Sequence, residues 1–366
     1  MLHSNLLQHS MDHHPGPMDA LGYLLGDDRC RSLAKRIAQN KKPGLAATRV
    51  EIFLTSSCNF HCGYCRSIHH TPPSWDSPNL MAKLNHWASA GTCHLQWTGG
   101  EPTLHPHLVR LVSHAHALGM MNSMSTNGSA STDLYTRLHE AGMSWFFVSL
   151  DHIETLSFDR WTGSRGKLAH VINTIHHLIA LKSAAQPCQL VINLMLTQES
   201  ATALLEDQAR GLRNLLTWCL TSGIDDFKFL PSSVTPFNTI FANTAMHQRF
   251  LDVCVEMVPK RFPFFHYRLT SLRHGGHGLQ GRRHHICRHF LDDRAFDSIG
   301  AYPCIIHLRE GGEYLYRHDD PEEAIAEKIE TFHHMNRVHD PLCYQNCFDV
   351  YRDFSDRVTF LLGQLE

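Results

Sequence analysis

Short apolar runs alternate with longer amphipathic stretches between residues 48 and 231. The runs are rich in β-branched residues and predict strands at Arg49–Thr55, His94–Thr98, Met121–Thr126, Trp145–Leu150, Gln189–Leu196 and Asp226–Leu230. The stretches between them predict helices at Asn79–Ser89, His107–Leu118, Ser131–Ala141, Gly166–Ser183 and Leu204–Ser222. In the fourth of these, Val171, Ile175 and Leu178 recur at helical spacing and give the helix one apolar face.

Strands that alternate with crossover helices predict a parallel sheet with right-handed connections. We therefore expect an α/β fold, a partial (β/α)6 TIM-like barrel whose strands are near-continuous apolar runs buried on at least one face. In such barrels the working residues lie on loops after the carboxyl ends of the strands. Cys58, Gly99, Asn127 and Asp151 each follow a predicted strand closely, so the pattern predicts a site at this edge.

The pattern differs on both sides of the predicted barrel. Residues 1–47 are expected to form an irregular leader with one helix at Asp27–Asn40, and residues 48–235 to form the barrel. After Pro231 the alternation stops, and we place a boundary near 231–240. Residues 236–366 are expected to form a small α+β extension that begins with a helix at Thr239–Val258.

Composition narrows the classes of function. The 366 residues, 43% of them hydrophobic and 19% charged, are enough for a large domain with a smaller one. A formal net charge of −2 gives no general attraction for nucleic acid, so no such partner is expected. No apolar run reaches membrane-spanning length and residues 1–17 do not resemble a signal peptide, so we expect a cytoplasmic protein without a membrane partner. The 30 histidines show no metal-binding spacing and are interpreted as solvated or packed.

Twelve cysteines in a chain without a secretion signal are expected to stay reduced, so those that cluster indicate a metal site or catalysis. Cys58, Cys62 and Cys65 stand at CxxxCxxC spacing just after the first predicted strand. An iron–sulfur cubane needs four ligands, one for each iron. A loop that supplies three leaves one iron open to a small molecule.

These residues resemble the radical S-adenosylmethionine (radical SAM) enzymes, over about residues 48–232. The resemblance rests on the CxxxCxxC loop with the aromatic Tyr64 before its last cysteine, and on three further motifs. These follow the second, third and fourth predicted strands as Trp97-Thr-Gly-Gly-Glu-Pro-Thr103, Ser125-Thr-Asn-Gly128 and Ser149-Leu-Asp151.

The resemblance implies that Cys58, Cys62 and Cys65 hold a [4Fe–4S] cluster whose fourth iron is chelated by the amino and carboxylate groups of S-adenosylmethionine. Reduction would cleave this ligand to methionine and a 5′-deoxyadenosyl radical, which abstracts hydrogen from a substrate. A flavodoxin or ferredoxin would be the reductant.

The resemblance also implies a set of residues that bind the cofactor. The glycines would expose backbone to the ligand, and the glutamate would accept a hydrogen bond from its ammonium group. The set is Gly99, Gly100, Glu101, Ser125, Asn127, Asp151 and Asn193.

One position departs from the family pattern. Many relatives carry arginine where this chain has Thr162. Arg160 or Arg165 would then have to take its place.

A second set of cysteines follows the barrel at Cys287, Cys304, Cys343 and Cys347. Its arrangement resembles the twitch domain, a shortened relative of the SPASM domain, which binds one auxiliary [4Fe–4S] cluster. Four thiols would ligate that cluster fully, which suits electron transfer. The CxxxC pair has one residue more than the usual CxxC, and zinc or plain thiols remain open alternatives.

The remaining cysteines are expected to be small buried hydrophobic residues, and they are Cys30, Cys93, Cys188, Cys219 and Cys254. Cys219 and Cys254 are also candidates for donating hydrogen to a substrate radical, as happens in radical epimerases.

Three functions follow from these patterns. The first is modification of a peptide or other natural-product precursor by crosslinking, epimerisation or oxidation. The second is a radical dehydrogenase or epimerase of a small molecule such as a sugar or aminocyclitol. The third is a non-catalytic iron–sulfur or zinc protein, which the open iron argues against. Residues 1–47 look too short for a leader-peptide-binding domain, which weakens the first interpretation.

Overall fold

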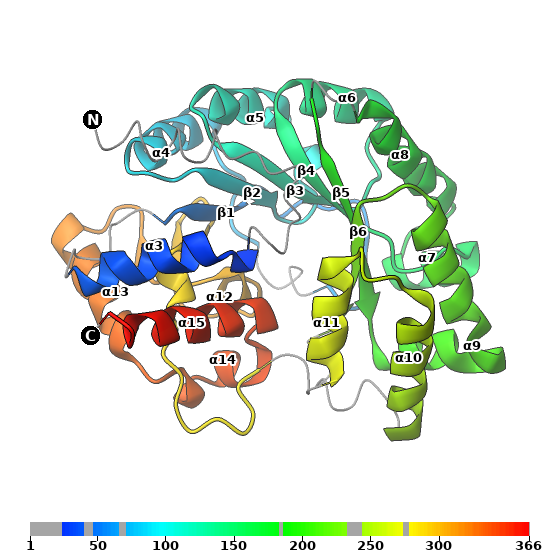
Figure 1. Ribbon diagram of the computed structural model, residues 1–366. Helices are drawn as coiled ribbons and strands as arrows, with labels where there is room; N and C mark the ends of the chain where they lie inside the picture. The colour runs from blue at the N-terminus through cyan, green and yellow to red at the C-terminus, as the bar shows by residue number, and fades with distance from the viewer. Residues whose placement is uncertain are drawn as a thin grey trace.

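A computed structural model of the chain describes residues 24–39, 47–65, 71–182, 186–232, 244–273 and 278–365. A curved sheet of nine strands forms its centre, in the order β6-β5-β4-β3-β2-β1-β7-β8-β9 (Figure 1). Strands β1 to β6 run parallel, as the alternation of strands and helices predicts. The fold is a partial TIM-like barrel of mixed α/β class.

The six barrel strands lie where the apolar runs predict them, within two residues at each end. They are β1 (Arg49–Phe53), β2 (His94–Thr98), β3 (Met121–Thr126), β4 (Met143–Ser149), β5 (Gln189–Leu196) and β6 (Asp226–Pro231). Because all six are parallel, their carboxyl ends meet at one edge of the sheet. The predicted site residues that follow the first four strands therefore lie at a common edge.

Helices cover the outer side of the curved sheet (Figure 1). They are α4 (Ser77–Ser89), α5 (Leu108–Ala117), α6 (Thr132–Glu140), α7 (Thr155–Thr162), α8 (Leu168–Leu181) and α9 (Gln198–Thr221). Side-chain caps mark several of their starts, since Asp76 accepts from Asn79 N and Ser131 from Leu134 N. Helix α9 is interrupted by non-helical residues from Glu206 to Ala209.

Buried polar side chains form a network through the middle of the sheet. Arg49 Nη1 donates to Glu51 Oε1 at 2.7 Å and to Asp293 Oδ2 at 2.5 Å, and Arg49 Nη2 donates to Gln96 Oε1 at 3.3 Å. Gln96 Nε2 in turn donates to Ser125 Oγ at 3.1 Å, at the carboxyl end of β3. The strands are buried as predicted, but they are not the near-continuous apolar runs expected, because alternate buried positions carry this network.

The extension continues the sheet of the barrel. Strand β7 (Asp293–Phe296) pairs in parallel with β1, and the short strands β8 (Gly300–Tyr302) and β9 (Tyr316–Arg317) follow it antiparallel. The apolar pattern does not reveal β7, because half of its four residues are the charged pair Asp293 and Arg294, both buried. The Arg49–Asp293 ion pair joins β1 to β7.

Two helices lie at the β6 edge of the sheet, where α10 (Thr244–Met257) packs on α9 and α11 (Pro263–Arg273) packs on β6 (Figure 1). The other helices lie on the side of β7 to β9, and they are η4 (His289–Leu291), α12 (Ile305–Arg309), α13 (Glu322–His334), η5 (Arg337–His339), α14 (Pro341–Asn346) and α15 (Asp349–Leu362). The predicted boundary near 231–240 and the first residues of the predicted helix at Thr239–Val258 lie outside the described residues, except for 231 and 232.

The predicted leader helix is α3 (Asp27–Ala38), which packs against α15 at the other end of the chain (Figure 1). Arg29 of α3 forms an ion pair with the buried Asp292 just before β7. Most of the rest of the predicted leader, residues 1–23 and 40–46, lies outside the described residues.

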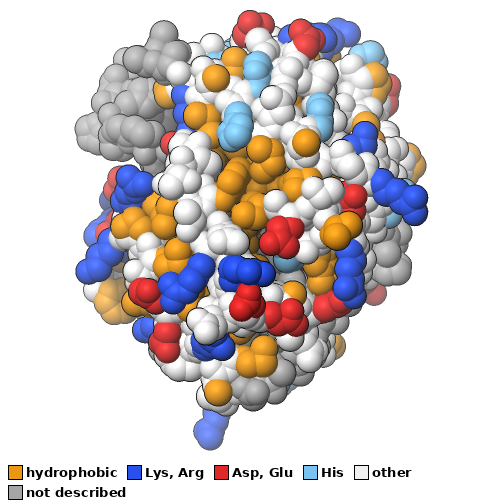
Figure 2. Space-filling view, turned by 90° about the vertical axis from the view of Figure 1, so that its right-hand side faces the viewer, with side chains coloured by type: hydrophobic (Ala, Val, Ile, Leu, Met, Phe, Trp, Pro, Cys, Tyr) orange, Lys and Arg blue, Asp and Glu red, His pale blue; other side chains and the backbone are white. Residues whose placement is uncertain are grey.

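No helix in the described parts of the chain has both the length and the apolar character to cross a membrane. On the face shown in Figure 2, side chains of both charge signs are interspersed and histidines lie apart from one another.

Candidate active site and thiol clusters

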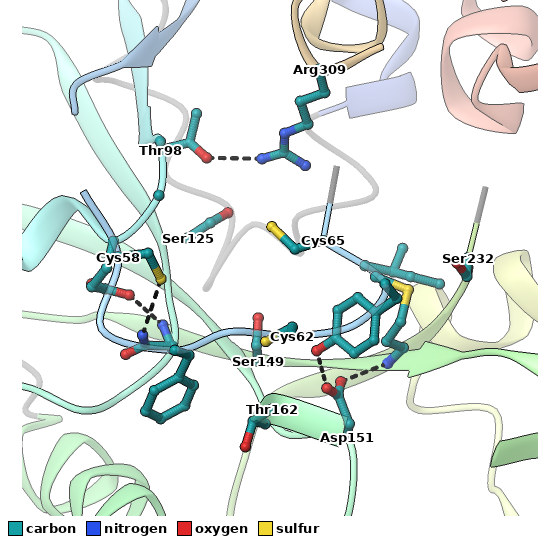
Figure 3. Close-up of a pocket in the computed structure, with 18 of the residues that line it drawn as sticks. Cys58, Cys62, Cys65, Thr98, Ser125, Ser149, Asp151, Thr162, Ser232 and Arg309 are labelled. Atoms are coloured by element: carbon teal, nitrogen blue, oxygen red, sulfur yellow. Dashed lines mark hydrogen bonds between the residues drawn. The ribbon is translucent and has the colours of Figure 1, made fainter. Parts of the chain in front are cut away.

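A cavity opens at the edge of the sheet where the parallel strands end (Figure 3). Residues of the loop after β1, the loop after β2, the ends of β3 and β4 and the extension line it together. Among the described residues, its cysteines are Cys58, Cys62 and Cys65. The sequence-predicted thiols thus share one cavity.

The three thiols lie close enough to interact. Burial, together with the charges of Asp151, Cys65 and Cys58, raises the pKa of the Cys62 thiol to about 12. Burial also raises the pKa of Cys58, with a contribution from Cys65. Neighbouring thiolates repel one another unless a cation lies between them, and a bound metal reverses this penalty. The donor set therefore fits a metal centre with three thiolate ligands.

Backbone hydrogen bonds hold the cysteine loop to two neighbours. His61 N donates to Thr162 O at 2.9 Å, at the end of α7. Glu101 N donates to Ser57 O at 2.8 Å, in the loop after β2. Helix α7, which the hydrophobic pattern does not predict, is thus one of the supports of the loop.

Gly99 and Gly100 are needed for close packing of the backbone. A Cβ on Gly99, whose φ is +141°, would meet the carbonyl oxygen of Thr55, and one on Gly100 would meet that of Ser57. Gly100 N also donates to Thr55 O at 2.8 Å. Both glycines line the cavity, so the structure adds a packing role to the expected exposure of backbone to a ligand.

Glu101 is 1% exposed, and its carboxylate accepts hydrogen bonds from the protein. Oε1 accepts from Thr103 N at 3.1 Å, Thr103 Oγ1 at 2.7 Å and Thr126 Oγ1 at 2.8 Å, and Oε2 accepts from Asn127 N at 2.7 Å. The side chain therefore links the loops after β2 and β3. The expected bond to a ligand ammonium would have to use the remaining acceptor site on Oε2.

Asn127 and Ser125 lie beside the thiols. Asn127 Nδ2 donates to Asn59 Oδ1 at 2.9 Å and approaches Cys58 Sγ at 4.0 Å. Ser125 lines the cavity at the end of β3 (Figure 3). The contact of Asn127 with the Cys58 sulfur carries no signal in the sequence, because the two residues are 69 positions apart.

Asp151 is tied to the cysteine loop through Tyr64, the aromatic residue of the motif. Its Oδ2 accepts from the Tyr64 hydroxyl and its Oδ1 from Met195 N, the latter at 3.0 Å (Figure 3). Burial raises the pKa of the Asp151 carboxyl to about 6, and these hydrogen bonds oppose the rise. The arrangement orients Tyr64 toward the cavity that both residues line.

Asn193, expected to contact the cofactor, pairs with Ser149 in the sheet and is not among the residues that line the cavity. Its Oδ1 is buried without a hydrogen-bond partner among the described residues. A buried acceptor without a partner is costly. The contact of Asn193 with the cofactor stays a prediction.

The arginines expected to replace Thr162 lie elsewhere. Arg160 forms an ion pair with the exposed Glu199, and Arg165 is exposed; neither lines the cavity. Thr162 itself lines it. The cation among the described lining residues is Arg309, which sequence reasoning missed because it comes from α12 of the extension.

Arg309 reaches across the cavity toward the barrel (Figure 3). Its Nη2 donates to Thr98 Oγ1 at 2.9 Å at the end of β2, and its Nε is buried without a partner among the described residues. Ile306 and Phe348 of the extension also line the cavity. The extension therefore forms one wall of the site.

The second set of thiols also comes together. The charges of Cys347, Cys304 and Cys287 raise the pKa of Cys343, after burial, and the charges of Cys287 and Cys304 do the same for Cys347. The four residues come from three separate segments. Cys287 precedes η4, Cys304 directly precedes α12, and Cys343 and Cys347 lie within α14 and directly after it. Four thiols that share one buried space fit a fully ligated metal centre.

A histidine and an aspartate stand next to this second set. His307 Nε2 lies 3.4 Å from Cys343 Sγ and 3.4 Å from Asp340 Oδ2. These three residues could hold a metal ion, since their ligand atoms lie within 4.8 Å of one another. Neither His307 nor Asp340 was singled out from the sequence.

Cys219 and Cys254, the candidate hydrogen donors, lie in the main hydrophobic core and do not line the cavity. Burial raises the pKa of both thiols.

Comparison with known proteins gives a family for the barrel. Residues 52–200 match the family model described as the Radical SAM superfamily. GTP 3′,8-cyclase of Xanthomonas axonopodis pv. citri is 29% identical over 136 residues, which cover 34% of this chain and 41% of that protein. The enzyme of the same name from Picosynechococcus sp. is 35% identical over 127 residues, or 32% of this chain and 39% of that protein. The chain thus spans about two fifths of the length of these relatives.

Solved structures of the same fold cover more of the chain. SuiB of Streptococcus suis bound to S-adenosylmethionine has a TM-score of 0.59 at 16% identity, and the match covers 84% of this chain and 70% of that chain. The enzyme anSMEcpe with bound AdoMet has a TM-score of 0.58 at 14% identity, over 86% of this chain and 98% of that chain. At these identities the likeness concerns the fold.

Proposed function

From the radical SAM domain of this chain, which is the domain of an enzyme superfamily, we propose that the protein reductively cleaves S-adenosylmethionine. The resulting radical would abstract hydrogen from a peptide or other natural-product precursor. When bound, a [4Fe–4S] cluster supplies the electron that splits this cosubstrate into methionine and a 5′-deoxyadenosyl radical. Cys58, Cys62 and Cys65 would hold that cluster.

The observation that carries the proposal is that three thiols line one cavity at the carboxyl edge of the sheet. The described residues that line this cavity include no fourth thiol. Three thiolate ligands leave one iron of a cubane for a small molecule. A non-catalytic iron–sulfur protein has no need of that open position, and the family of the barrel domain argues against this third interpretation.

The residues around the thiols would position the cosubstrate. We assign Gly99, Gly100 and Ser125 to this task because they line the cavity beside the cysteine loop. Asp151 would act by orienting Tyr64 through their hydrogen bond. The walls contributed by the extension would limit the access of water and of stray hydrogen donors.

We also propose that Cys287, Cys304, Cys343 and Cys347 bind an auxiliary [4Fe–4S] cluster, as in a twitch-like domain. Four partly buried thiols whose charges act on one another support a fully ligated centre. A zinc ion is the alternative, and His307 and Asp340 beside Cys343 are donors that zinc accepts. The metal content of the purified protein distinguishes the two.

A peptide substrate is supported by a protein of the same fold. SuiB of Streptococcus suis, also solved bound to the precursor peptide SuiA, matches this chain with a TM-score of 0.53. Reduction would require a flavodoxin or ferredoxin, and we place the protein in the cytoplasm, where such reductants act.

A small-molecule substrate is the second candidate, as for a sugar or aminocyclitol dehydrogenase or epimerase. The observation that favours a small molecule is the similarity of the barrel to proteins named GTP 3′,8-cyclase. That similarity covers about a third of this chain.

Stimulated cleavage of the cosubstrate distinguishes these candidates. The protein, reconstituted anaerobically with iron and sulfide and reduced, is given S-adenosylmethionine with either GTP, aminocyclitols or short peptides encoded beside its gene. The proposal predicts that a peptide raises the yield of 5′-deoxyadenosine and that the peptide itself changes in mass. Stimulation by GTP or by an aminocyclitol alone would contradict the peptide assignment and support the second candidate.

A further inference from the structure

Arg337 lies between two of the segments that carry the second set of thiols. Its backbone N donates to His285 O at 2.8 Å, and the neighbouring Asn336 forms an antiparallel bridge with Ile286. This bridge aligns η5 with the segment that ends at Cys287.

Asp340 connects Arg337 to α14, the helix that carries Cys343 and is followed by Cys347. Arg337 Nη1 donates to Asp340 Oδ2 at 3.1 Å. Asp340 Oδ1 accepts from Leu342 N at 2.9 Å and from Cys343 N at 3.2 Å, and thereby caps α14. The guanidinium is therefore held in place relative to Cys343.

The guanidinium of Arg337 is buried, with the residue 2% exposed, and its Cζ lies 3.7 Å from the centre of the Phe332 ring. Its Nε and Nη2 have no hydrogen-bond partner among the described residues. Leaving two donors of a buried charge unpaired is costly, unless an acceptor occupies the space beside them. Asp340 is paired with Nη1 alone, so Nε and Nη2 keep donors free for an acceptor beside the segments that carry Cys287 and Cys343.

We propose that Arg337 directs its unpaired Nε–H and Nη2–H toward the sulfur atoms of the auxiliary iron–sulfur centre and raises its reduction potential. This inference rests on the proposed function, in which the four cysteines of the extension hold a [4Fe–4S] cluster. Arg337 is a positioning and tuning residue, since it contacts no substrate.

The direction of the effect follows from the charges. A cubane held by four thiolates is an anion, and reduction adds one further electron to it. A buried cation and N–H donors stabilise the more negative state, so the centre accepts an electron more readily. Such a centre is suited to take up the electron that leaves an oxidised substrate, and is a weaker reductant toward the first site.

The test uses the full-length protein with Cys58, Cys62 and Cys65 changed to Ala, so that only the auxiliary site can hold iron. After anaerobic reconstitution, the midpoint potential of the remaining cluster is measured by redox titration followed by electron paramagnetic resonance. Into this background we introduce Arg337→Met, which removes charge and donors, and Arg337→Lys, which keeps the charge without the planar fork. Arg317→Met, at an exposed arginine of β9, is the matched control.

The proposal predicts a midpoint potential shifted to more negative values in Arg337→Met, a smaller shift in Arg337→Lys and none in Arg317→Met. An unchanged potential in Arg337→Met, with about four irons retained, overturns this inference and leaves the auxiliary cluster standing. Zinc in place of iron in the starting protein overturns the auxiliary cluster, and the inference with it. If the Arg337→Met variant loses its iron, the midpoint potential of the Arg337→Lys variant tests the inference in its place. Loss of iron from both, with the fold intact by circular dichroism, assigns Arg337 to cluster retention and overturns a tuning role.

Discussion

Glu101 makes contacts within the protein that its motif does not predict. The sequence predicts a hydrogen bond to a ligand ammonium, and in the fold its two oxygens also accept four hydrogen bonds from Thr103, Thr126 and Asn127. The carboxylate thus holds the loops after β2 and β3 together beside the thiols. No sequence pattern reveals this, because the partners depend on the pairing of β2 with β3.

His152 gives a pH dependence at the level of a single residue. It follows Asp151, is 7% exposed and stacks on Trp161. Burial lowers the pKa of His152 from its ordinary value of 6.5 to about 4. Because the folded-state pKa is the lower one, the stability that neutral His152 contributes is present above pH 6.5 and is lost as the pH falls toward 4.

We therefore predict that His152→Gln removes part of the acid sensitivity of the fold. The lowering of the pKa from 6.5 to about 4 corresponds to about 3 kcal/mol between the two ends of this range. Urea unfolding at several pH values measures it, with exposed His86→Gln as the control. A free-energy difference between wild type and His152→Gln that stays constant from pH 7 to pH 4 would refute the prediction.

At the scale of elements, the cysteine loop depends on the end of α7. Gly163 ends this helix with φ +59°, and a Cβ there would lie 2.5 Å from His61 O. Gly166 has a similar φ of +62° but open space around the position of a Cβ. An alanine would therefore meet the same backbone strain at both positions. Only at position 163 would it also collide with the cysteine loop.

Substitutions at Gly163 and Gly166 test whether the end of α7 supports the cysteine loop. Alanine at either position costs about 1 kcal/mol for the left-handed backbone. Gly163→Ala must in addition push His61 away, which we expect to cost about 2 kcal/mol more. Urea unfolding and the iron retained per chain measure the effect. Equal stability and equal iron content in Gly163→Ala and Gly166→Ala would show that α7 does not hold the loop.

Periodicity was sufficient to predict the strands of the barrel, because β1 to β6 are mostly buried segments, and amphipathic helices follow β1, β2, β3 and β5. It failed for α7, whose eight residues are too few to display an apolar face. It failed also for β7, because Asp293 is buried in an ion pair with the distant Arg49, and Arg294 in hydrogen bonds to Phe290 and Tyr316. From sequence alone, charged residues predict an exposed segment, because the distant residues that neutralise them in the fold are not known.

At the scale of the whole molecule, barrel and extension share one sheet and one cavity. Strand β7 pairs with β1, and Arg49 and Asp293 join the two strands within the buried polar network. Through this pairing the extension brings Arg309 opposite the cysteine loop. The sequence motifs predicted the barrel side of the site, since each follows a strand, whereas the opposite wall depends on contacts between residues far apart in the chain.

The central claim is that Cys58, Cys62 and Cys65 hold the centre that cleaves S-adenosylmethionine. The measurement that tests it most directly is the amount of 5′-deoxyadenosine formed per chain by the reconstituted, reduced protein. We predict formation by the wild type and by Cys93→Ala, which removes a thiol outside both sets, and none by the Cys58/Cys62/Cys65→Ala variant. Formation of 5′-deoxyadenosine by that triple variant at the rate of the wild type would contradict the claim.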